Sequence, residues 1–294
     1  MASRSERVGI YYQLPTFFVS MALIIYPLLY VIYLSFNELN LYVSMDTVFV
    51  GINNYRMLLS DEHFVEALTN SFIFVLGSTP MHFLLSLAFA LIANEEFKGR
   101  SLYRGIMFAP WVMPIVVASV IWRWMLHPDW GIYNNIFRLL GLLGGTQTIG
   151  WLTDSNLVWL GVCYVNWIKN YPFMFVNILA ALSSVPVELY EAAKIDGANA
   201  ISRFRYITLP TIKPVCYLML LLGVINTFIN FEVIWLLTEG GPGWATTTYG
   251  IYVYILSFQE WKLGYGAAFG IVGLIVSLIF ALLYIKYFME LAKK

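Results

Sequence analysis

The chain has 294 residues, of which 60% are hydrophobic and 12% are charged, against roughly 45–50% and 25% in an ordinary soluble domain. This composition excludes an ordinary soluble domain and indicates a membrane protein. The 17 basic and 17 acidic residues leave no net charge, so nothing favours a nucleic-acid partner or attraction to a lipid surface by bulk charge.

Six apolar runs are each close to the roughly 20 residues that a bilayer core requires of a helix. In chain order they are Leu14–Phe36, Leu68–Ala93, Gly105–Leu126, Leu157–Leu182, Val215–Leu237 and Ala267–Tyr287. Prolines inside the runs are tolerated in lipid and predict kinks, not ends; they are Pro27, Pro80, Pro110, Pro114 and Pro172. We therefore expect an all-α, polytopic fold with six transmembrane helices. It forms a single domain over residues 1–294, with a core at about 68–289 and a peripheral first helix and outer loop at 1–67.

Basic residues are distributed unequally between the two sets of connections. One side carries Arg4, Arg7, Lys98, Arg100, Arg104, Lys194, Arg203, Arg205, Lys213, Lys286, Lys293 and Lys294. The other side carries only Arg56, Arg138 and Lys262. The positive-inside rule therefore predicts that both termini and the loop 184–212 lie in the cytoplasm.

Polar residues interrupt two of the runs at membrane depth, where such groups are costly and usually face a cavity or each other. The fourth run places Asn166, Lys169 and Asn170 on one helical face, and the fifth places Asn226 and Asn230 one turn apart. Amide groups suit sugar hydroxyls, and aromatic rings suit the C–H faces of a sugar. We therefore expect a substrate path lined by Asn166, Lys169, Asn170, Tyr171, Asn226, Asn230, Phe231 and Glu232. The alternative is that these side chains only bond neighbouring helices. For Glu232, which faces away from Asn230 on a straight helix, the two interpretations are even.

The loop 184–212 is an island of charge between apolar runs. Pro186 suits the start of a helix that Ser184 could cap, and Gly197 suits a sharp turn with positive φ. After the turn, the pattern predicts a second short helix that ends at Leu209–Pro210 and carries an apolar stripe. The expectation is a helical hairpin at the cytoplasmic surface.

Specific letters of this loop resemble a known motif. Glu191-Ala192-Ala193 is followed after three residues by Gly197, and after nine more by the letters ITLP at 207–210. This spacing resembles the cytoplasmic "EAA" loop of bacterial ABC importer permeases. The segments LLTEGGP at 236–242 and WKLGYGAA at 261–268 are similar to the carbohydrate-importing branch of that family, the maltose and glycerol-phosphate type.

The resemblance implies a type I ABC importer permease fold in the bacterial cytoplasmic membrane, with the hairpin docked on an ATPase subunit. The docking residues would be Glu191, Ala192, Ala193, Asp196, Gly197 and Ala198. It also implies four kinds of partner besides membrane lipid: a second, homologous permease, two ATPase subunits that bind ATP and Mg, an extracytoplasmic sugar-binding protein, and the sugar itself. No cofactor is expected in this chain.

The chain lacks the motifs of an enzyme. It contains no GxxxxGK[ST] phosphate loop and no HExxH. His63, His82 and His127 are isolated, and we expect them to be packed or interfacial; Cys163 and Cys216 lie in apolar runs as inert thiols. We therefore expect no catalytic residues and no metal site. The alternative function is an ion-coupled secondary transporter of a small polar solute, with Lys169 and Glu232 as coupling groups.

Overall fold

The computed structural model describes residues 4–292, and its elements are almost all helical. Lys293 and Lys294, two of the basic residues counted for topology, lie outside the described residues. The chain divides into two compact units, residues 1–65 with 252–276 and residues 66–251 with 277–294. Each unit is described by itself below.

Four helices within the described residues are long and apolar enough to cross a membrane alone, and six spans result if each of two bent helix pairs counts as one. The four are Tyr12–Ser35, Glu62–Asn94, Ala200–Phe228 and Leu263–Leu283. The bent pairs are Arg100–Val112 with Ile115–Met125, at 95°, and Val158–Ser183 with Val187–Ile195, at 67°. Each of the six predicted apolar runs overlaps one of these spans, so the predicted all-α membrane architecture is confirmed.

The first unit begins with a long apolar rod. Helix α1 (Arg4–Ser20), a π-helical stretch (Met21–Ile25) and α2 (Tyr26–Ser35) follow without a break. Only 6% of the apolar window in this rod is buried, which suits a surface in contact with lipid. The unit continues with β1 (Asn37–Glu38), β2 (Val48–Phe49), α3 (Asn53–Leu59), the start of α4 (Glu62–Asn94), a π-helical stretch (Ile255–Gln259) and the first part of α14 (Leu263–Ala292).

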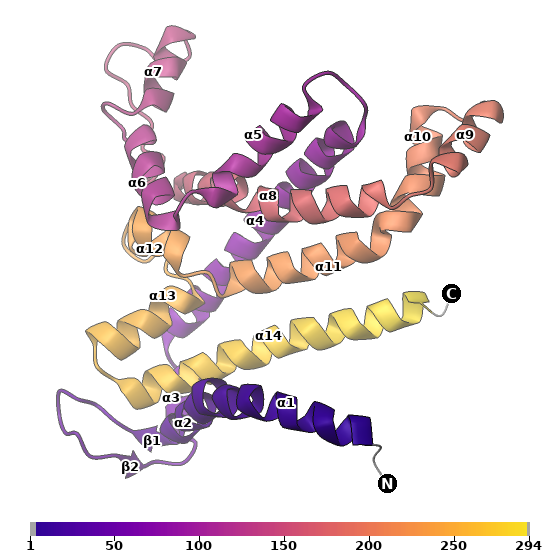
Figure 1. The fold of residues 1–294 in the computed structure, drawn as a ribbon. Helices are drawn as coiled ribbons and strands as arrows, with labels where there is room; N and C mark the ends of the chain where they lie inside the picture. Colours follow the sequence, from indigo (N-terminus) through magenta and orange to yellow (C-terminus); the bar gives the residue numbers. More distant parts are fainter. Residues whose placement is uncertain (1–3, 293–294) are drawn as a thin grey trace. The chain divides into compact units, whose positions relative to one another are not determined.

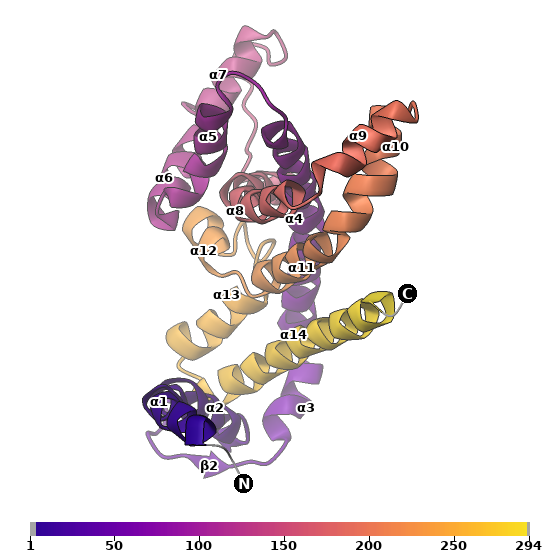
Figure 2. The ribbon, with the colours of Figure 1, turned by 45° about the vertical axis from the view of Figure 1, so that its right-hand side comes forward.

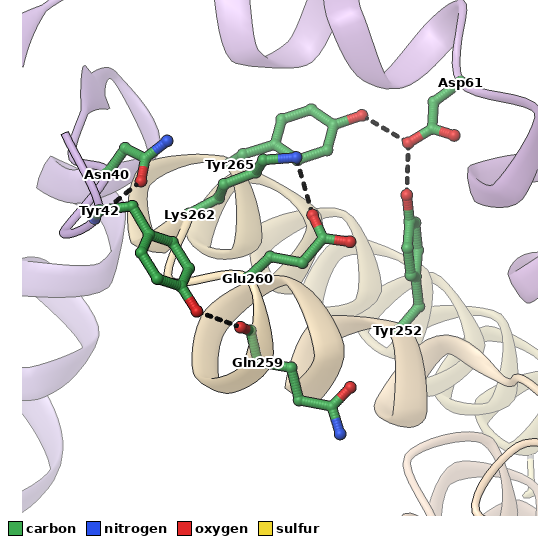
Figure 3. A network of polar contacts seen from close by, with 8 residues as sticks. All are labelled: Asn40, Tyr42, Asp61, Tyr252, Gln259, Glu260, Lys262 and Tyr265. Carbon is green, nitrogen blue, oxygen red and sulfur yellow. Dashed lines mark hydrogen bonds and ion pairs between the residues drawn. The ribbon is translucent and has the colours of Figure 1, made fainter.

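Polar contacts join the segments of the first unit (Figure 3). Oδ2 of Asp61 accepts hydrogen bonds from the hydroxyls of Tyr252, at 2.6 Å, and Tyr265, at 2.7 Å, while Oδ1 accepts the backbone N–H of His63 at 2.9 Å. Burial raises the pKa of Asp61, but these hydrogen bonds outweigh burial and hold it below its ordinary value. Asp61 thus bonds two tyrosines that lie about 190 and 200 positions later in the sequence.

The second unit holds most of α4, the start of α13 (Tyr249–Tyr254) and the end of α14. Its other helices are α5 (Arg100–Val112), α6 (Ile115–Met125), α7 (Ile132–Leu139), α8 (Val158–Ser183), α9 (Val187–Ile195), α10 (Ala200–Arg203), α11 (Leu209–Phe228) and α12 (Glu232–Thr238). Helices α8 and α11 lie side by side in both ribbon views (Figures 1 and 2). Their contact forms a buried core with α4, in which Phe175, Ile178 and Ile212 are almost completely inaccessible. Ser86 of α4 also donates to the backbone oxygen of Tyr171 in α8 at 2.7 Å.

Two of the predicted spans are broken. The expectation that prolines only kink the helices was wrong at Pro114, and the break in the fifth run was not predicted. Helix α5 ends at Val112 because Met113, which precedes Pro114, takes an extended conformation (φ −66°, ψ 129°), as steric conflict with the proline ring favours. The fifth run ends as a helix at Phe228 and restarts at Glu232. Pro80, Pro110 and Pro172 do lie inside continuous helices.

The loop 184–212 forms the predicted turn but not the predicted helix end. Gly197 has a φ of +77° between α9 and α10, and Asn199 Oδ1 accepts the N–H of Ser202 at 2.8 Å to cap α10. The helix then continues through a π-helical stretch (Phe204–Thr208) into α11, so Pro210 lies at an early position of α11 instead of ending a short helix. Ser184 does not cap α9, because its hydroxyl donates to Ala181 O in the last turn of α8.

Candidate functional site

A cavity opens between the membrane-spanning helices of the second unit. Its volume is about 220 Å³, below the roughly 300–1,000 Å³ typical of pockets for drug-sized ligands. Helices α4, α5, α8 and α11 and the break after α11 supply its wall, which consists of His82, Trp111, Asn170, Phe173, Met174, Gly223, Asn226, Thr227 and Asn230. We call it the central cavity. Its size suits one ring of a small polar ligand, with the remainder of a longer ligand extending outside.

Three of the predicted path residues, Asn170, Asn226 and Asn230, line the central cavity together. Asn170 donates through Nδ2 to the backbone oxygen and Oδ1 of Asn166, at 3.1 and 2.7 Å, which leaves its Oδ1 for a ligand. Asn230 lies in the break after α11, where its Oδ1 accepts the N–H of Val233 in the first turn of α12 at 3.2 Å. Asn226 is exposed to the opening. The wall therefore offers both amide donors and amide acceptors.

An aromatic pair forms another part of this wall. The rings of Trp111 and Phe173 are stacked, with centroids 6.4 Å apart and planes inclined by 26°. Phe173 lies one turn after Asn170 on α8, so an apolar ring and an amide share one face of this helix. Amides beside ring faces can bind a molecule that has hydroxyl groups around an apolar C–H skeleton.

Lys169 lies elsewhere, at the break between α5 and α6. Its Nζ donates to the backbone oxygens of Pro110, Trp111 and Met113, at 3.3, 3.0 and 2.6 Å. These belong to the last turn of α5, whose carbonyls have no intrahelical partner once the helix ends. The ammonium group also complements the negative end of the helix dipole. In this conformation Lys169 fastens α8 to the break and does not line the central cavity.

The other predicted path residues are also absent from the cavity wall. Asn166 is buried and bonds Asn170, so it supports the wall from behind. Tyr171 is buried in the helix core, where its ring packs edge-on against Phe89 at 5.1 Å. Phe231 stacks on Trp235 at 5.5 Å, and Glu232 is an exposed residue in the first turn of α12.

Two wall features depend on the tertiary structure. His82, which the sequence indicated only as an isolated histidine, lines the cavity from α4. Its ionisable side chain at membrane depth was the available signal. Gly223 lets α11 lie close to α8 and α4, since a Cβ at this position would overlap Met174 Cε of α8 and would lie 3.1 Å from both His82 Nε2 and Thr79 Cγ2 of α4. A larger residue there would intrude on the helix contact and on the cavity floor.

The predicted docking residues lie on α9 and in the turn that follows it. Glu191, Ala192, Asp196 and Gly197 are exposed, and Ala193 and Ala198 are half-buried. Large apolar side chains beside them are also exposed: Ile195 is 88% accessible, Ile201 76% and Tyr206 73%. Exposed apolar groups of this kind mark surfaces that contact another protein or a membrane.

The chain matches a family model described as "Binding-protein-dependent transport system inner membrane component" over residues 63–288. It is 34% identical to the trehalose/maltose transport system permease protein MalF of Thermococcus litoralis over 288 residues, which cover 96% of this chain and 94% of the relative. It is 31% identical to the arabinooligosaccharides transport system permease protein AraP of Halalkalibacterium halodurans, with coverage of 95% and 87%. The fold is similar to a crystal structure of a bacterial ABC transporter involved in the import of the acidic polysaccharide alginate, with a TM-score of 0.82, 25% identity, and coverage of 98% and 96%.

Proposed function

The chain belongs to the binding-protein-dependent transport system inner membrane component family, and on this premise we propose that it is a permease subunit of an ATP-driven ABC importer for a sugar or oligosaccharide. Members of this family are membrane components of transporters and not enzymes. The family resemblance inferred from the EAA-like letters is thereby confirmed. The observation that carries the proposal is the central cavity, where amides and stacked rings meet among membrane-spanning helices.

Sugar is the substrate class that this wall fits best. Asn170, Asn226 and Asn230 supply hydrogen-bonding groups for ring hydroxyls, and Trp111 and Phe173 offer faces for C–H groups. Relatives named as permeases for trehalose/maltose and for arabinooligosaccharides point to the same class. No Asp, Glu, Lys or Arg is among the described residues of the wall, which favours a neutral sugar.

The loop 184–212 is the proposed coupling element. Its exposed apolar side chains and the turn at Gly197 suit docking in a cleft of an ATPase subunit in the cytoplasm, with Glu191 making a polar contact there. Two such subunits would bind ATP and Mg. Helices α10 and α11 form one continuous helical segment, Ala200–Phe228. A displacement of the hairpin would therefore be transmitted along this segment to the cavity wall.

The complete transporter would also contain a second, homologous permease and an extracytoplasmic sugar-binding protein. A similar solved structure is described as a bacterial alginate ABC transporter in complex with its pentasaccharide-bound periplasmic protein. Both termini of the present chain would lie in the cytoplasm, as its basic residues predict. ATP binding and hydrolysis by the partners would then alternate the access of the cavity between the two sides of the membrane.

The ion-coupled alternative has less support. Lys169, one of its two coupling groups, donates to three backbone oxygens at the α5–α6 break, and the family is one of binding-protein-dependent systems. Uptake that collapses with a protonophore but survives ATP depletion would favour this alternative instead.

The experiment is sugar uptake by the complete transporter in proteoliposomes, with and without ATP and the binding protein. Asn226→Leu should lower kcat/KM for uptake about tenfold, which corresponds to the loss of about one hydrogen bond. The matched control is Asn177→Leu on α8, because Asn177 donates to its own helix at Phe173 O (2.8 Å) and does not line the cavity. Equal uptake by both variants would remove Asn226 from the path.

A further inference from the structure

His82 is a buried polar side chain without a partner. It is only 1% exposed, and within the described residues neither Nδ1 nor Nε2 has a hydrogen bond. Leaving a buried polar group unsatisfied costs about 1–3 kcal/mol, and such groups are uncommon in folded proteins. A polar side chain at membrane depth is moreover expensive enough that it usually has a function. The unpaired imidazole therefore indicates a hydrogen-bonding ligand.

His82 lies beside Gly223 and Met174 at the cavity wall. A Cβ built on Gly223 would lie 3.1 Å from His82 Nε2 and would overlap Met174 Cε, and all three residues belong to the wall of the central cavity. Because Gly223 has no side chain, the imidazole and the flexible Met174 side chain both fit against α11 at this point. The hydroxyl of Thr79 donates to Thr227 at 3.4 Å and not to the imidazole.

The chemistry of the imidazole fits a hydroxyl group. A neutral imidazole has one donor and one acceptor, and a sugar hydroxyl can satisfy either. No acidic side chain is present in the described wall to pair with a charged imidazole. The same wall carries Asn170, Asn226 and Asn230, so a sugar ring bound to these amides would lie in the cavity that His82 also lines.

We propose that His82 is a specificity-determining residue, whose imidazole hydrogen-bonds one ring hydroxyl of the transported sugar at the cavity wall beside Gly223, where the flexible Met174 side chain moves aside for the ligand. The inference rests on the proposed function and deepens it. Binding would satisfy a group that the empty protein leaves unpaired, so the site would discriminate against a sugar that lacks this one hydroxyl. A site built to bond a hydroxyl rejects its deoxy analogue for this reason.

The test uses the complete transporter in proteoliposomes. Wild-type uptake is first measured with maltose, trehalose and arabinobiose, and then with each monodeoxy analogue of the sugar that is taken up. For the wild type, removal of one particular hydroxyl should raise KM about tenfold. In His82→Leu the parent sugar should show a raised KM of about the same size, and the penalty for that one analogue should disappear.

Two further variants separate recognition from packing. His82→Gln keeps a hydrogen-bond donor and an acceptor, so it provides a second variant if His82→Leu fails to fold. The ratio of the KM values for the same analogue and the parent sugar should differ at least threefold from the wild-type ratio. Ser78→Ala alters a buried side chain one turn earlier on α4 that is not part of the wall, and it should leave the analogue profile unchanged.

The outcomes distinguish the inference from the proposed function. Wild-type sugar uptake that does not require ATP would overturn the proposed function and the role of His82 with it. ATP-dependent wild-type uptake together with the same analogue profile in the wild type, His82→Leu and His82→Gln would overturn the role of His82 alone.

Discussion

The central cavity and the loop 184–212 expose opposite kinds of side chain. In the cavity, polar groups lie inside an apolar helical body, and the imidazole of His82 has no hydrogen-bond partner there among the described residues. In the loop, apolar groups project from a charged surface segment, with Ile195 88% exposed. Each region thus displays the groups that the chain by itself does not satisfy.

The difference indicates two different partners. Unpaired donors and acceptors within a small cavity suit a small polar molecule, whereas exposed apolar side chains suit a protein surface that excludes water. The two regions are joined by α8 and by the continuous helix Ala200–Phe228. These helices are therefore the continuous elements through which a displacement at one region can reach the other.

The largest effect is expected from a substitution that distorts the turn at Gly197 in the loop 184–212 and leaves the central cavity unchanged. At Gly197, with φ +77°, an added Cβ meets no atom within 4 Å, so a substitution acts through the backbone alone. A left-handed conformation costs an L-residue roughly 1–2 kcal/mol, and the β-branched valine is at the upper end. Gly197→Val should lower sugar uptake about 10- to 30-fold, while ATP hydrolysis continues and membrane insertion is unchanged.

Gly197→Asn is the matched control, because asparagine tolerates this conformation better than other non-glycine residues. Uptake and ATP hydrolysis are measured on the same reconstituted samples. Normal coupled transport by Gly197→Val would show that the turn has no part in coupling.

A smaller effect is expected where the cavity wall is supported from behind. Lys169→Met removes the donor for the backbone oxygens of Pro110, Trp111 and Met113. Unsatisfied backbone groups should lower the free energy of unfolding by about 1–3 kcal/mol. Because Trp111 also lines the cavity, uptake should fall with stability.

Thermal unfolding of the purified transporter in detergent measures this loss. Lys169→Arg retains several donors at the end of a long side chain and should recover most of the stability. If Lys169→Met is as stable as the wild type but takes up no sugar, the lysine acts on the substrate and not on the helix break.

The smallest effect concerns the first unit, where the polar groups of Asp61 are satisfied within the chain. Its folded-state pKa lies below the ordinary carboxyl value of about 3.9. The carboxylate therefore stabilises the fold at pH values above that ordinary value, and its contribution is lost as the pH falls through the lowered pKa. The contribution should be about 1 kcal/mol or less, because Asp61 is only partly buried and solvent screens it.

Asp61→Asn should accordingly lower the melting temperature by a few degrees at pH 7 and have a smaller effect at pH 3. The analogue profile of sugar uptake should remain that of the wild type. A changed profile would mean that polar groups satisfied within the chain also influence sugar recognition. Recognition would then not depend on the unpaired groups of the central cavity alone.

Much of this protein follows from local features of its sequence. Apolar runs of membrane length, the basic residues in alternate connections, and the glycine at 197 each depend on neighbours within a few residues, and so the spans and the turn are predictable. Asn170, Asn226 and Asn230 were also identifiable as candidates, because amides at membrane depth are costly wherever the helices lie.

The breaks and the composition of the cavity wall were decided by the tertiary structure. Lys169 appeared to face a path, but its three acceptors lie 56 to 59 positions earlier in the chain. They became available only because the chain before Pro114 left the helix. Likewise, His82 of α4 lines the cavity where Gly223 of α11 and Met174 of α8 pack against it. Helical periodicity determines which residues share a face, whereas the packing of distant helices determines what that face meets.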